Sequence, residues 1–235
     1  MATRSLDGAV VAVVGAGGGL GSPLSATLAD RGATVVLAGR SAESLRATAA
    51  SSPALGNALQ VVCDVRDPAA GDVLAAAVAA GPGRLDGVVL ASGVVAFGNL
   101  VDHDDMVIEE LFLTNVVGPL WMLKRLIPLL IESKGFVTNL SAVVAEQPLP
   151  GMSVYAATKA ALTAADTALV RELRRSGITV CDVRPPHTET GLATRPIGGD
   201  APSLPEGLAP QVVVDRIVAA IEAGDREVPS DAFGS

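Results

Sequence analysis

Residues 10–21 of the chain read Val-Val-Ala-Val-Val-Gly-Ala-Gly-Gly-Gly-Leu-Gly, a short apolar run followed by a glycine-rich turn. Continuous apolar residues predict a strand buried on both faces, and Pro23 is tolerated in the first turn of a helix that follows. Glycine permits positive φ and a close backbone approach, and a helix N-terminus favours an anion. The stretch therefore predicts a site for a dinucleotide pyrophosphate, with a turn packed for its own sake as the alternative. The residues assigned to this site are Gly15, Gly17, Gly18, Gly19, Leu20 and Gly21.

Strand-like and helix-length segments alternate along the rest of the chain. The apolar runs are continuous rather than alternating, which is typical of strands buried on both faces, and they lie at 10–14, 34–38, 59–63, 87–90, 135–140 and 178–183. The helix-length segments lie at about 19–31, 41–51, 67–80, 103–132, 152–176 and 209–223. This order predicts an α/β fold, a single doubly wound Rossmann-type domain over residues 1–235. We expect a parallel sheet of about six to seven strands with helices on both faces.

The composition indicates a soluble, enzyme-sized chain and argues against several kinds of partner. A net charge of −8 and a pI near 4.7 disfavour nucleic acid and anionic membranes, because binding them needs a basic stripe. No apolar segment is expected to span a membrane, and the N-terminus lacks the pattern of an export signal. Cys63 and Cys181 lie far apart without CxxC spacing, so we expect no disulfide framework, no metal site and a cytoplasmic location.

Residues 184–208 form a long segment without a helix or strand pattern. Five prolines and four glycines in it disfavour regular structure, and a loop of this length in a compact domain is usually functional or disordered. We interpret the segment as a substrate lid. His187 lies in it and could contact substrate, although a loop histidine usually faces solvent. The other histidine, His103, stands among aspartates and is expected at a solvated helix start.

Residues after the second, third and fourth predicted strands extend the predicted cofactor site. Arg40 follows the second strand, where no carboxylate is available for a ribose 2′-hydroxyl. A guanidinium there favours NADP(H), with NAD(H) possible, and a solvated arginine is the alternative. Asp64 and Val65 follow the third strand, where a carboxylate can accept a hydrogen bond from adenine. Ala91 and Gly93 follow the fourth strand, and their small size lets a cofactor lie against the backbone.

Tyr155 is the only tyrosine of the chain, and Lys159 stands four residues after it. Residues at this spacing share one face of a helix, so an ammonium beside the phenol favours the anionic form of tyrosine. A phenol in that setting can act as an acid or a base. The alternative is an amphipathic helix on which a lysine extends past a half-buried tyrosine.

These residues resemble the motifs of the short-chain dehydrogenase/reductase family, classical type, over nearly the whole chain. The glycine turn is similar to the family's TGxxxGxG, with Val14 in place of the threonine, and Tyr155 and Lys159 match YxxxK. Thr190 matches the threonine of PGxxxT that lies near the nicotinamide amide. The resemblance implies that Asn115 supports a proton relay through water and that Lys159 also binds the cofactor ribose.

One departure from the family pattern affects catalysis. The family's catalytic serine precedes the tyrosine by thirteen residues, and that position is Ala142 here, while Ser141 stands one residue early. Side chains alternate along a strand, so Ser141 faces away from the direction of Ala142 if the strand continues. A loop could restore the serine, and Ser141 therefore stays among the predicted catalytic residues. Thr138 and Ser153 are the alternative sources of a hydroxyl.

The sequence as a whole indicates an oxidoreductase that interconverts a carbonyl and a secondary alcohol by hydride transfer. Asn115, Tyr155, Lys159 and Ser141 are its predicted catalytic residues. The substrate is a small carbonyl or alcohol of unknown identity, and the resemblance implies a homodimer or homotetramer. The alternative, motivated by Ala142, is a nucleotide-binding sensor or scaffold of the same fold with little turnover.

Overall fold

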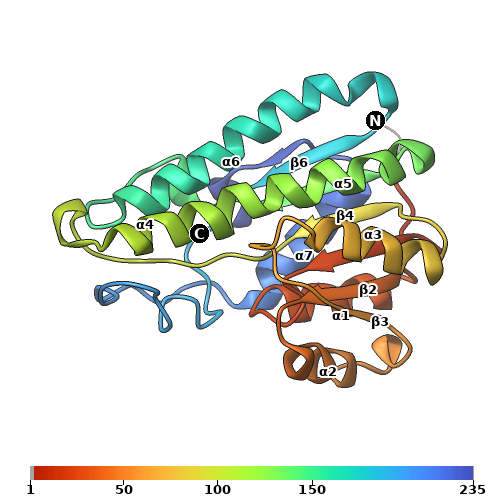
Figure 1. Cartoon of the computed structure of the whole chain (residues 1–235), viewed down its shortest axis with the longest axis horizontal. Helices are drawn as coiled ribbons and strands as arrows, with labels where there is room; N and C mark the ends of the chain where they lie inside the picture. The colour runs from red at the N-terminus through yellow and green to blue at the C-terminus, as the bar shows by residue number, and fades with distance from the viewer. Residues whose placement is uncertain (1–2, 235) are drawn as a thin grey trace.

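Seven parallel strands form one sheet at the centre of the protein. The computed structural model describes residues 3–234, so residues 1–2 and 235 of the predicted domain lie outside the described residues. The strand order is β3-β2-β1-β4-β5-β6-β7 (Figure 1). This order confirms the predicted doubly wound α/β fold. The strands are β1 (Val10–Val14), β2 (Thr34–Gly39), β3 (Leu59–Val62), β4 (Gly87–Leu90), β5 (Phe136–Leu140), β6 (Thr179–Val183) and β7 (Glu227–Val228).

The strand order reverses at β1, which pairs with β2 on one side and with β4 on the other. All five residues of β1 are buried, because apolar layers cover both faces of the sheet at its centre. A crevice opens beyond the carboxyl ends of the strands at such a reversal, and ligands of doubly wound folds bind there. The glycine turn that follows β1 therefore lies at the topological switch point.

Helices cover both faces of the sheet, each with a separate apolar core. One core contains buried residues of α1, α2 and α7. The other contains those of α3 and α5 together with the opposite side chains of the strands, and partly buried residues of α6 pack against it. The two sets alternate along β1, where Val11 and Val13 belong to the first core and Val10, Ala12 and Val14 to the second. The helices are α1 (Gly21–Asp30), α2 (Ala42–Ala50), α3 (Ala70–Ala80), α4 (Asp105–Phe112), α5 (Gly118–Ser133), α6 (Ser153–Glu172) and α7 (Pro210–Ala223).

The helix predicted over 103–132 is one long element with a break in its regularity. Residues Leu113–Val117 form a π-helical turn between α4 and α5, and sequence periodicity did not predict it. An 18-residue window of the element Asp105–Ser133 has a mean hydropathy of 1.4, so this element is long and apolar enough to cross a membrane by length and composition alone, whereas the sequence led us to expect no such segment. Of its apolar window, 44% is buried inside the protein, where α5 packs on α3 and the sheet.

Other differences from the sequence-based expectations lie at the edges of elements. Strand β3 is an edge strand, and Val62 is 55% exposed, so it is not buried on both faces as predicted. His103 precedes the helix that it was expected to begin, since Asp104 caps α4 by accepting a hydrogen bond from the backbone of Met106.

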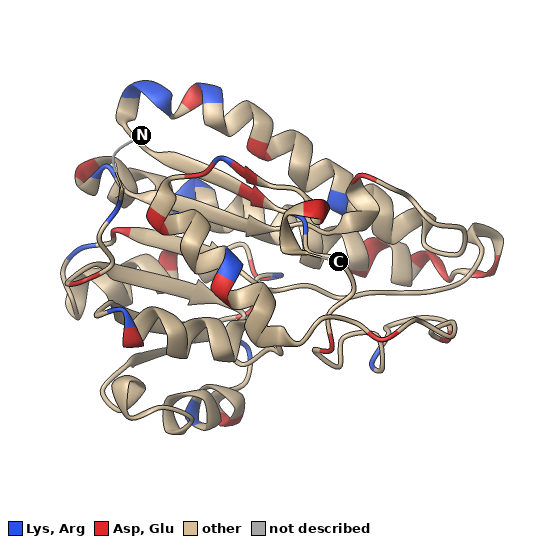
Figure 2. Cartoon of the chain, turned by 180° about the vertical axis from the view of Figure 1, so that it is seen from behind, with Lys and Arg blue, Asp and Glu red and all other residues tan. Residues whose placement is uncertain are grey.

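Acidic and basic residues are interspersed over most elements (Figure 2).

The loop after β6 runs beside the loop after β4. Residues 184–208 contain no helix or strand, apart from an isolated bridge between Thr188 and Leu208. Two backbone hydrogen bonds join the loop to residues 95–97: Ile197 donates to Val95 and Phe97 donates to Gly198, both at 2.9 Å. Figure 1 places this loop and the start of α4 at the same end of the molecule. The loop thereby covers one side of the crevice.

Candidate active site

A cavity of about 530 Å³ opens at the carboxyl ends of the strands, a size typical of small-molecule sites. It extends from the glycine turn and the end of β2 to the loop after β6. Gly21 and Asn115 are not among the residues that line this cavity. The other predicted cofactor and catalytic residues line it: Gly15, Gly17, Gly18, Gly19, Leu20, Arg40, Asp64, Val65, Ala91, Gly93, Ser141, Tyr155, Lys159 and Thr190.

The glycine turn leaves no room for side chains at several positions. Gly15 has φ of +87°, and a Cβ there would lie 2.7 Å from the backbone nitrogen of Ser92. A Cβ on Gly21 would lie 2.1 Å from the carbonyl oxygen of Gly15. Helix α1 begins at Gly21 with no acidic residue in its first turn. Bare backbone and an uncompensated helix N-terminus together fit the pyrophosphate of a dinucleotide.

The far end of the cavity, beyond β2 and β3, carries paired charges. The guanidinium of Arg66 lies 2.6 Å from the carboxylate of Asp64 and 2.9 Å from that of Glu110. Hydrogen bonds from Arg66 lower the pKa of Asp64. Arg40 is exposed and lines the same end of the cavity. Asp64 thus meets an arginine that sequence reasoning did not identify, and Arg40 lies close enough to lower its pKa further.

Tyr155 and Lys159 lie on the buried face of α6, 7% and 5% exposed. The Nζ atom of Lys159 is 5.8 Å from the centroid of the Tyr155 ring, and it donates a hydrogen bond of 2.8 Å to the carbonyl of Leu140 at the end of β5. The helix therefore presents the two side chains together, as the four-residue spacing predicted. The lysine is fixed by a backbone acceptor rather than extended toward solvent.

Burial shifts both groups of the pair toward their neutral forms. It raises the pKa of the Tyr155 phenol and lowers the pKa of Lys159 to about 8, where the negative charge of Asp182 opposes the fall. The expectation that Lys159 lowers the pKa of Tyr155 is thus outweighed by desolvation in the protein alone. A phenolate at this site needs more positive charge than Lys159 supplies.

Asn115 lies in the π-helical turn and binds two other elements. Its side-chain amide exchanges two hydrogen bonds of 2.9 Å with the backbone of Val94, and Nδ2 also donates to the hydroxyl of Thr158 at 3.1 Å. The Thr158 hydroxyl in turn donates to the carbonyl of Tyr155 at 2.7 Å. π-Helical turns often occur at functional sites. Here the turn aims Asn115 at the loop after β4 and at the helix that carries Tyr155.

Ser141 and Ala142 point in opposite directions, because the backbone stays extended through Ala142 (φ −173°, ψ 164°). The Ser141 hydroxyl donates to the carboxylate of Asp182, and the carbonyl of Val183 is a second acceptor 3.1 Å from the same oxygen. The methyl group of Ala142 belongs to the same apolar cluster as Tyr155. The hydroxyl of Ser141 therefore has a partner other than a substrate, and its predicted catalytic role is not supported by this geometry. Thr138 is buried within β5, and Ser153 is exposed at the start of α6.

The loop after β6 contacts both ends of the site. Thr190 packs on the glycine turn so closely that a Cβ on Gly19 would lie 2.4 Å from the Thr190 carbonyl oxygen. His187 lines the cavity, and its Nε2 atom is 3.4 Å from the carboxylate of Glu189. That carboxylate accepts a hydrogen bond from the backbone of Gly207 at 2.8 Å. These contacts join the two ends of the loop beside the cavity.

Apolar side chains form the wall of the cavity around Tyr155. They come from the loop after β4, the turn after β5 and the loop after β6. Those that line the cavity and belong to the cluster around Tyr155 are Val94, Val95, Phe97, Ala142, Val143, Val144, Met152, Leu192, Ala193 and Ile197. An apolar wall excludes water and strengthens the electrostatic interactions inside it.

Sequence reasoning missed three residues of this arrangement. Thr158 lies inside the YxxxK motif, and its position on the buried side of the helix was a usable signal. Arg66 stands two residues after Asp64, and local charge alternation was the signal. Asp182 gave none, because a carboxylate inside a predicted buried strand indicates only that a partner exists, not which one.

Comparisons with known proteins identify the family of this chain. The family model described as short chain dehydrogenase matches residues 9–196. An uncharacterized oxidoreductase of Staphylococcus haemolyticus is 30% identical over 210 residues, which cover 88% of this chain and 90% of that protein. A short-chain dehydrogenase from Streptomyces avermitilis has a similar structure, with a TM-score of 0.84, 27% identity and coverage of 96% of this chain and 90% of that one. A 3-ketoacyl-(acyl-carrier-protein) reductase from Brucella melitensis, complexed with NADH, has a TM-score of 0.84, 25% identity and coverage of 97% and 100%.

Proposed function

The chain belongs to the short-chain dehydrogenase family, and on that premise we propose that it interconverts a carbonyl compound and a secondary alcohol, using NADP(H) in preference to NAD(H). The observation that carries this proposal is the buried Tyr155–Lys159 pair in a cavity that continues to the glycine turn. A nicotinamide bound there supplies or accepts the hydride. The exposed guanidinium of Arg40 supports the preference for a 2′-phosphate.

In the reducing direction, Tyr155 donates its phenolic proton to the carbonyl oxygen as negative charge develops there. Lys159 stabilises the resulting phenolate, and the positive charge of an oxidised nicotinamide adds to this effect. Both charges oppose the burial that raises the pKa of the tyrosine. Asn115 and Thr158 hold the Tyr155 end of α6 against the loop after β4. The apolar wall favours a substrate whose carbonyl is attached to an apolar group.

Ala142 supports a second candidate function, a nucleotide-binding sensor or scaffold with little turnover. No hydroxyl side chain occupies this position, and Ser141 is engaged by Asp182. A preorganised donor of this kind is worth roughly 10²–10³ in rate. Its absence slows the reaction, while the tyrosine, lysine and asparagine keep their arrangement.

Two measurements on the purified protein separate these functions. Binding of NADPH and NADH is followed by fluorescence, and oxidation of NADPH is followed by absorbance with a panel of apolar ketones and aldehydes. An enzyme both binds NADPH and oxidises it in the presence of at least one carbonyl compound. Binding without turnover across the panel, in either direction, supports the sensor. Absence of binding to either nucleotide contradicts both functions.

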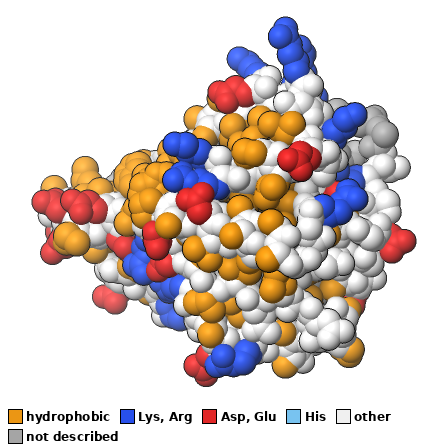
Figure 3. Space-filling model, turned by 45° about the vertical axis from the view of Figure 1, so that its right-hand side comes forward, with side chains coloured by type: hydrophobic (Ala, Val, Ile, Leu, Met, Phe, Trp, Pro, Cys, Tyr) orange, Lys and Arg blue, Asp and Glu red, His pale blue; other side chains and the backbone are white. Residues whose placement is uncertain are grey.

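We also propose that the protein is a cytoplasmic homodimer or homotetramer and that residues 184–208 act as a substrate lid. Exposed apolar side chains along α4 and α5 support association, and they include Met106, Leu120 and Ile131. Hydrophobic side chains also form patches between charged ones on the face seen in Figure 3.

Cys63 and Cys181 are free and buried, which agrees with a reducing compartment. The hydrogen bonds between this loop and residues 95–97 support the lid.

A further inference from the structure

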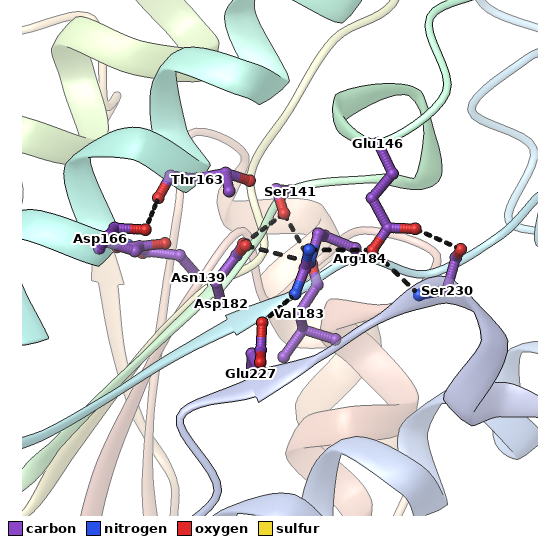
Figure 4. Close-up of polar contacts among 11 residues, drawn as sticks. Asn139, Ser141, Glu146, Thr163, Asp166, Asp182, Val183, Arg184, Glu227 and Ser230 are labelled. Carbon is purple, nitrogen blue, oxygen red and sulfur yellow. Dashed lines mark hydrogen bonds and ion pairs between the residues drawn. The ribbon is translucent and has the colours of Figure 1, made fainter.

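A group of charged side chains lies behind the site, at the carboxyl ends of β5 and β6 (Figure 4). Asp182, on β6, is 5% exposed. Its carboxylate accepts a hydrogen bond from the hydroxyl of Ser141 and lies 3.3 Å from Nε of Arg184. A buried carboxylate requires such partners, because leaving it without them is costly. Family resemblance assigned no function to Asp182.

Arg184 does not neutralise Asp182 alone. Its guanidinium also lies 3.0 Å from Glu146, in the turn after β5, and 2.5 Å from Glu227 on β7 (Figure 4). One guanidinium thus serves three carboxylates, so the formal charge of the group is 1 − 3 = −2. Glu227 is largely exposed and Glu146 partly so, whereas Asp182 is buried beside the core of the site. The buried carboxylate of the group is therefore that of Asp182. Burial raises the pKa of Asp182, and the hydrogen bond from Ser141 and the charge of Arg184 oppose that rise.

Lys159 is a buried ammonium whose direct hydrogen-bond acceptor is the neutral carbonyl of Leu140. A second buried acid, on the same helix as Lys159, is Asp166, whose carboxyl accepts a hydrogen bond from Asn139. Burial raises the pKa of Asp166 to about 8, so this carboxyl is mostly protonated near neutral pH and carries little charge. Asp182 is the acid that raises the pKa of Lys159 against the effect of burial. Tyr155 is neutral in the resting site, since burial raises its pKa.

Asp182 is also connected to Lys159 through the backbone. Ser141, which Asp182 holds by its hydroxyl, directly follows Leu140, and the Ser141 amide donates to the carbonyl of Val183 at 2.8 Å. The carbonyl that accepts from Lys159 therefore belongs to the Leu140–Ser141 peptide, which Ser141 anchors to β6 through its amide and its hydroxyl. The same carboxylate therefore affects Lys159 in two ways. Its negative charge raises the pKa of the ammonium, and its hydrogen bond to Ser141 holds the peptide whose carbonyl accepts from Lys159.

We propose that Asp182 is a positioning residue that keeps the ammonium of Lys159 protonated and, through Ser141, holds the Leu140 carbonyl against it. This inference rests on the proposed function, in which Lys159 stabilises the tyrosinate. It gives Ser141 a role in supporting the lysine instead of a direct role at the substrate. The positive charge of Arg184 offsets part of the negative charge of Asp182, because the same guanidinium also lies near Glu146 and Glu227.

Direct titration of Lys159 tests the proposal without cofactor or substrate. The chain has three lysines, Lys124, Lys134 and Lys159, so protein labelled with carbon-13 at lysine Cε gives three NMR signals, and Lys159→Arg assigns the third. We expect Asp182→Asn to lower the titration midpoint of Lys159 by about one pH unit, the size expected for loss of a nearby opposite charge. Glu227→Gln is the matched control, because it removes an exposed carboxylate from the same arginine, and it should leave the midpoint nearly unchanged.

The remaining outcomes decide the inference as follows. An unchanged midpoint in Asp182→Asn, or an equal fall in Glu227→Gln, overturns it. If Asp182→Asn does not fold, Arg184→Gln carries the test with the opposite sign: the midpoint should rise, and a midpoint that stays the same or falls overturns the proposal. Where turnover is found, the alkaline limb of its pH profile should move down with the NMR midpoint. A shifted midpoint in a protein without turnover supports the inference and contradicts the proposed function.

Discussion

At the scale of single residues, Ala142 most directly limits the proposed chemistry. The extended backbone aims its methyl group at the apolar cluster that contains Tyr155, so a serine there would bring a hydroxyl to the same place. We expect Ala142→Ser to raise kcat by at least about 10-fold and by no more than the roughly 10²–10³ that one preorganised donor supplies. Steady-state kinetics on any accepted carbonyl compound measure the change, with Ser141→Ala as a comparison. An unchanged or lower kcat in Ala142→Ser would show that catalysis does not depend on a hydroxyl at this position.

The proposed preference for NADP(H) rests on Arg40. Its exposed guanidinium has no ion pair within the described residues and lines the adenosine end of the cavity. Removing it should weaken NADPH binding by about 10-fold or more, because a 2′-phosphate loses a charged partner, and should leave NADH binding nearly unchanged. Fluorescence titration of Arg40→Ala with both nucleotides tests this, with the exposed Arg46→Ala on α2 as the control. An equal loss for the two nucleotides would reject the preference.

At the scale of elements, the contact between β5 and α6 makes stability depend on pH. Asp166 on α6 is 1% exposed and accepts a hydrogen bond from Asn139 on β5. Burial raises the pKa of Asp166 from 3.8 to about 8, so the folded state holds a proton that the unfolded state releases between these values. The free energy of unfolding therefore falls as pH rises through this window, by at most about 1.4 kcal/mol per pH unit from this group.

Asp166→Asn removes this titration while keeping the shape of the side chain. We expect the variant to lose much of the decrease in stability between about pH 4 and pH 8 and to be more stable than the wild type above this window. Urea unfolding at a series of pH values measures both effects. The exposed Asp200→Asn serves as the control and should follow the wild type. Parallel pH profiles for Asp166→Asn and the wild type would mean that Asp166 is ionised in the folded protein.

At the scale of the whole molecule, the long helix α4–α5 presents apolar side chains to solvent. Leu120 is 38% exposed on it, and Met106 and Ile131 are more exposed still. A surface of this kind is stabilised when a second copy covers it. We expect Leu120→Arg to lower the molar mass measured by light scattering after size-exclusion chromatography, with Val212→Arg on α7 as the control. A wild type that is monomeric at micromolar concentration would exclude the interface.

Much of the fold could be predicted from the sequence, because continuous Val- and Ala-rich runs and a glycine turn carry strong local signals. Strand β7 and the π-helical turn at 113–117 could not, since a two-residue edge strand and one extra residue per turn leave no periodic trace. The cavity gathers most of the predicted site residues, whereas the partner of Ser141 depends on side-chain direction and on Asp182, far along the chain. Burial also reversed the expected shift in the pKa of Tyr155, because motif spacing contains no information on desolvation.

Tyr155 is proposed to transfer the proton in a nicotinamide-dependent reaction, and Tyr155→Phe removes that proton. The substitution keeps the ring beside Lys159 and removes only the hydroxyl. The measurement is the rate of NADPH oxidation with a carbonyl compound that the wild type reduces, compared at equal occupancy by NADPH. We predict a loss of about 10²–10⁴-fold in this rate, with NADPH affinity changed little. Equal rates for the variant and the wild type would mean that the Tyr155 hydroxyl does not transfer the proton.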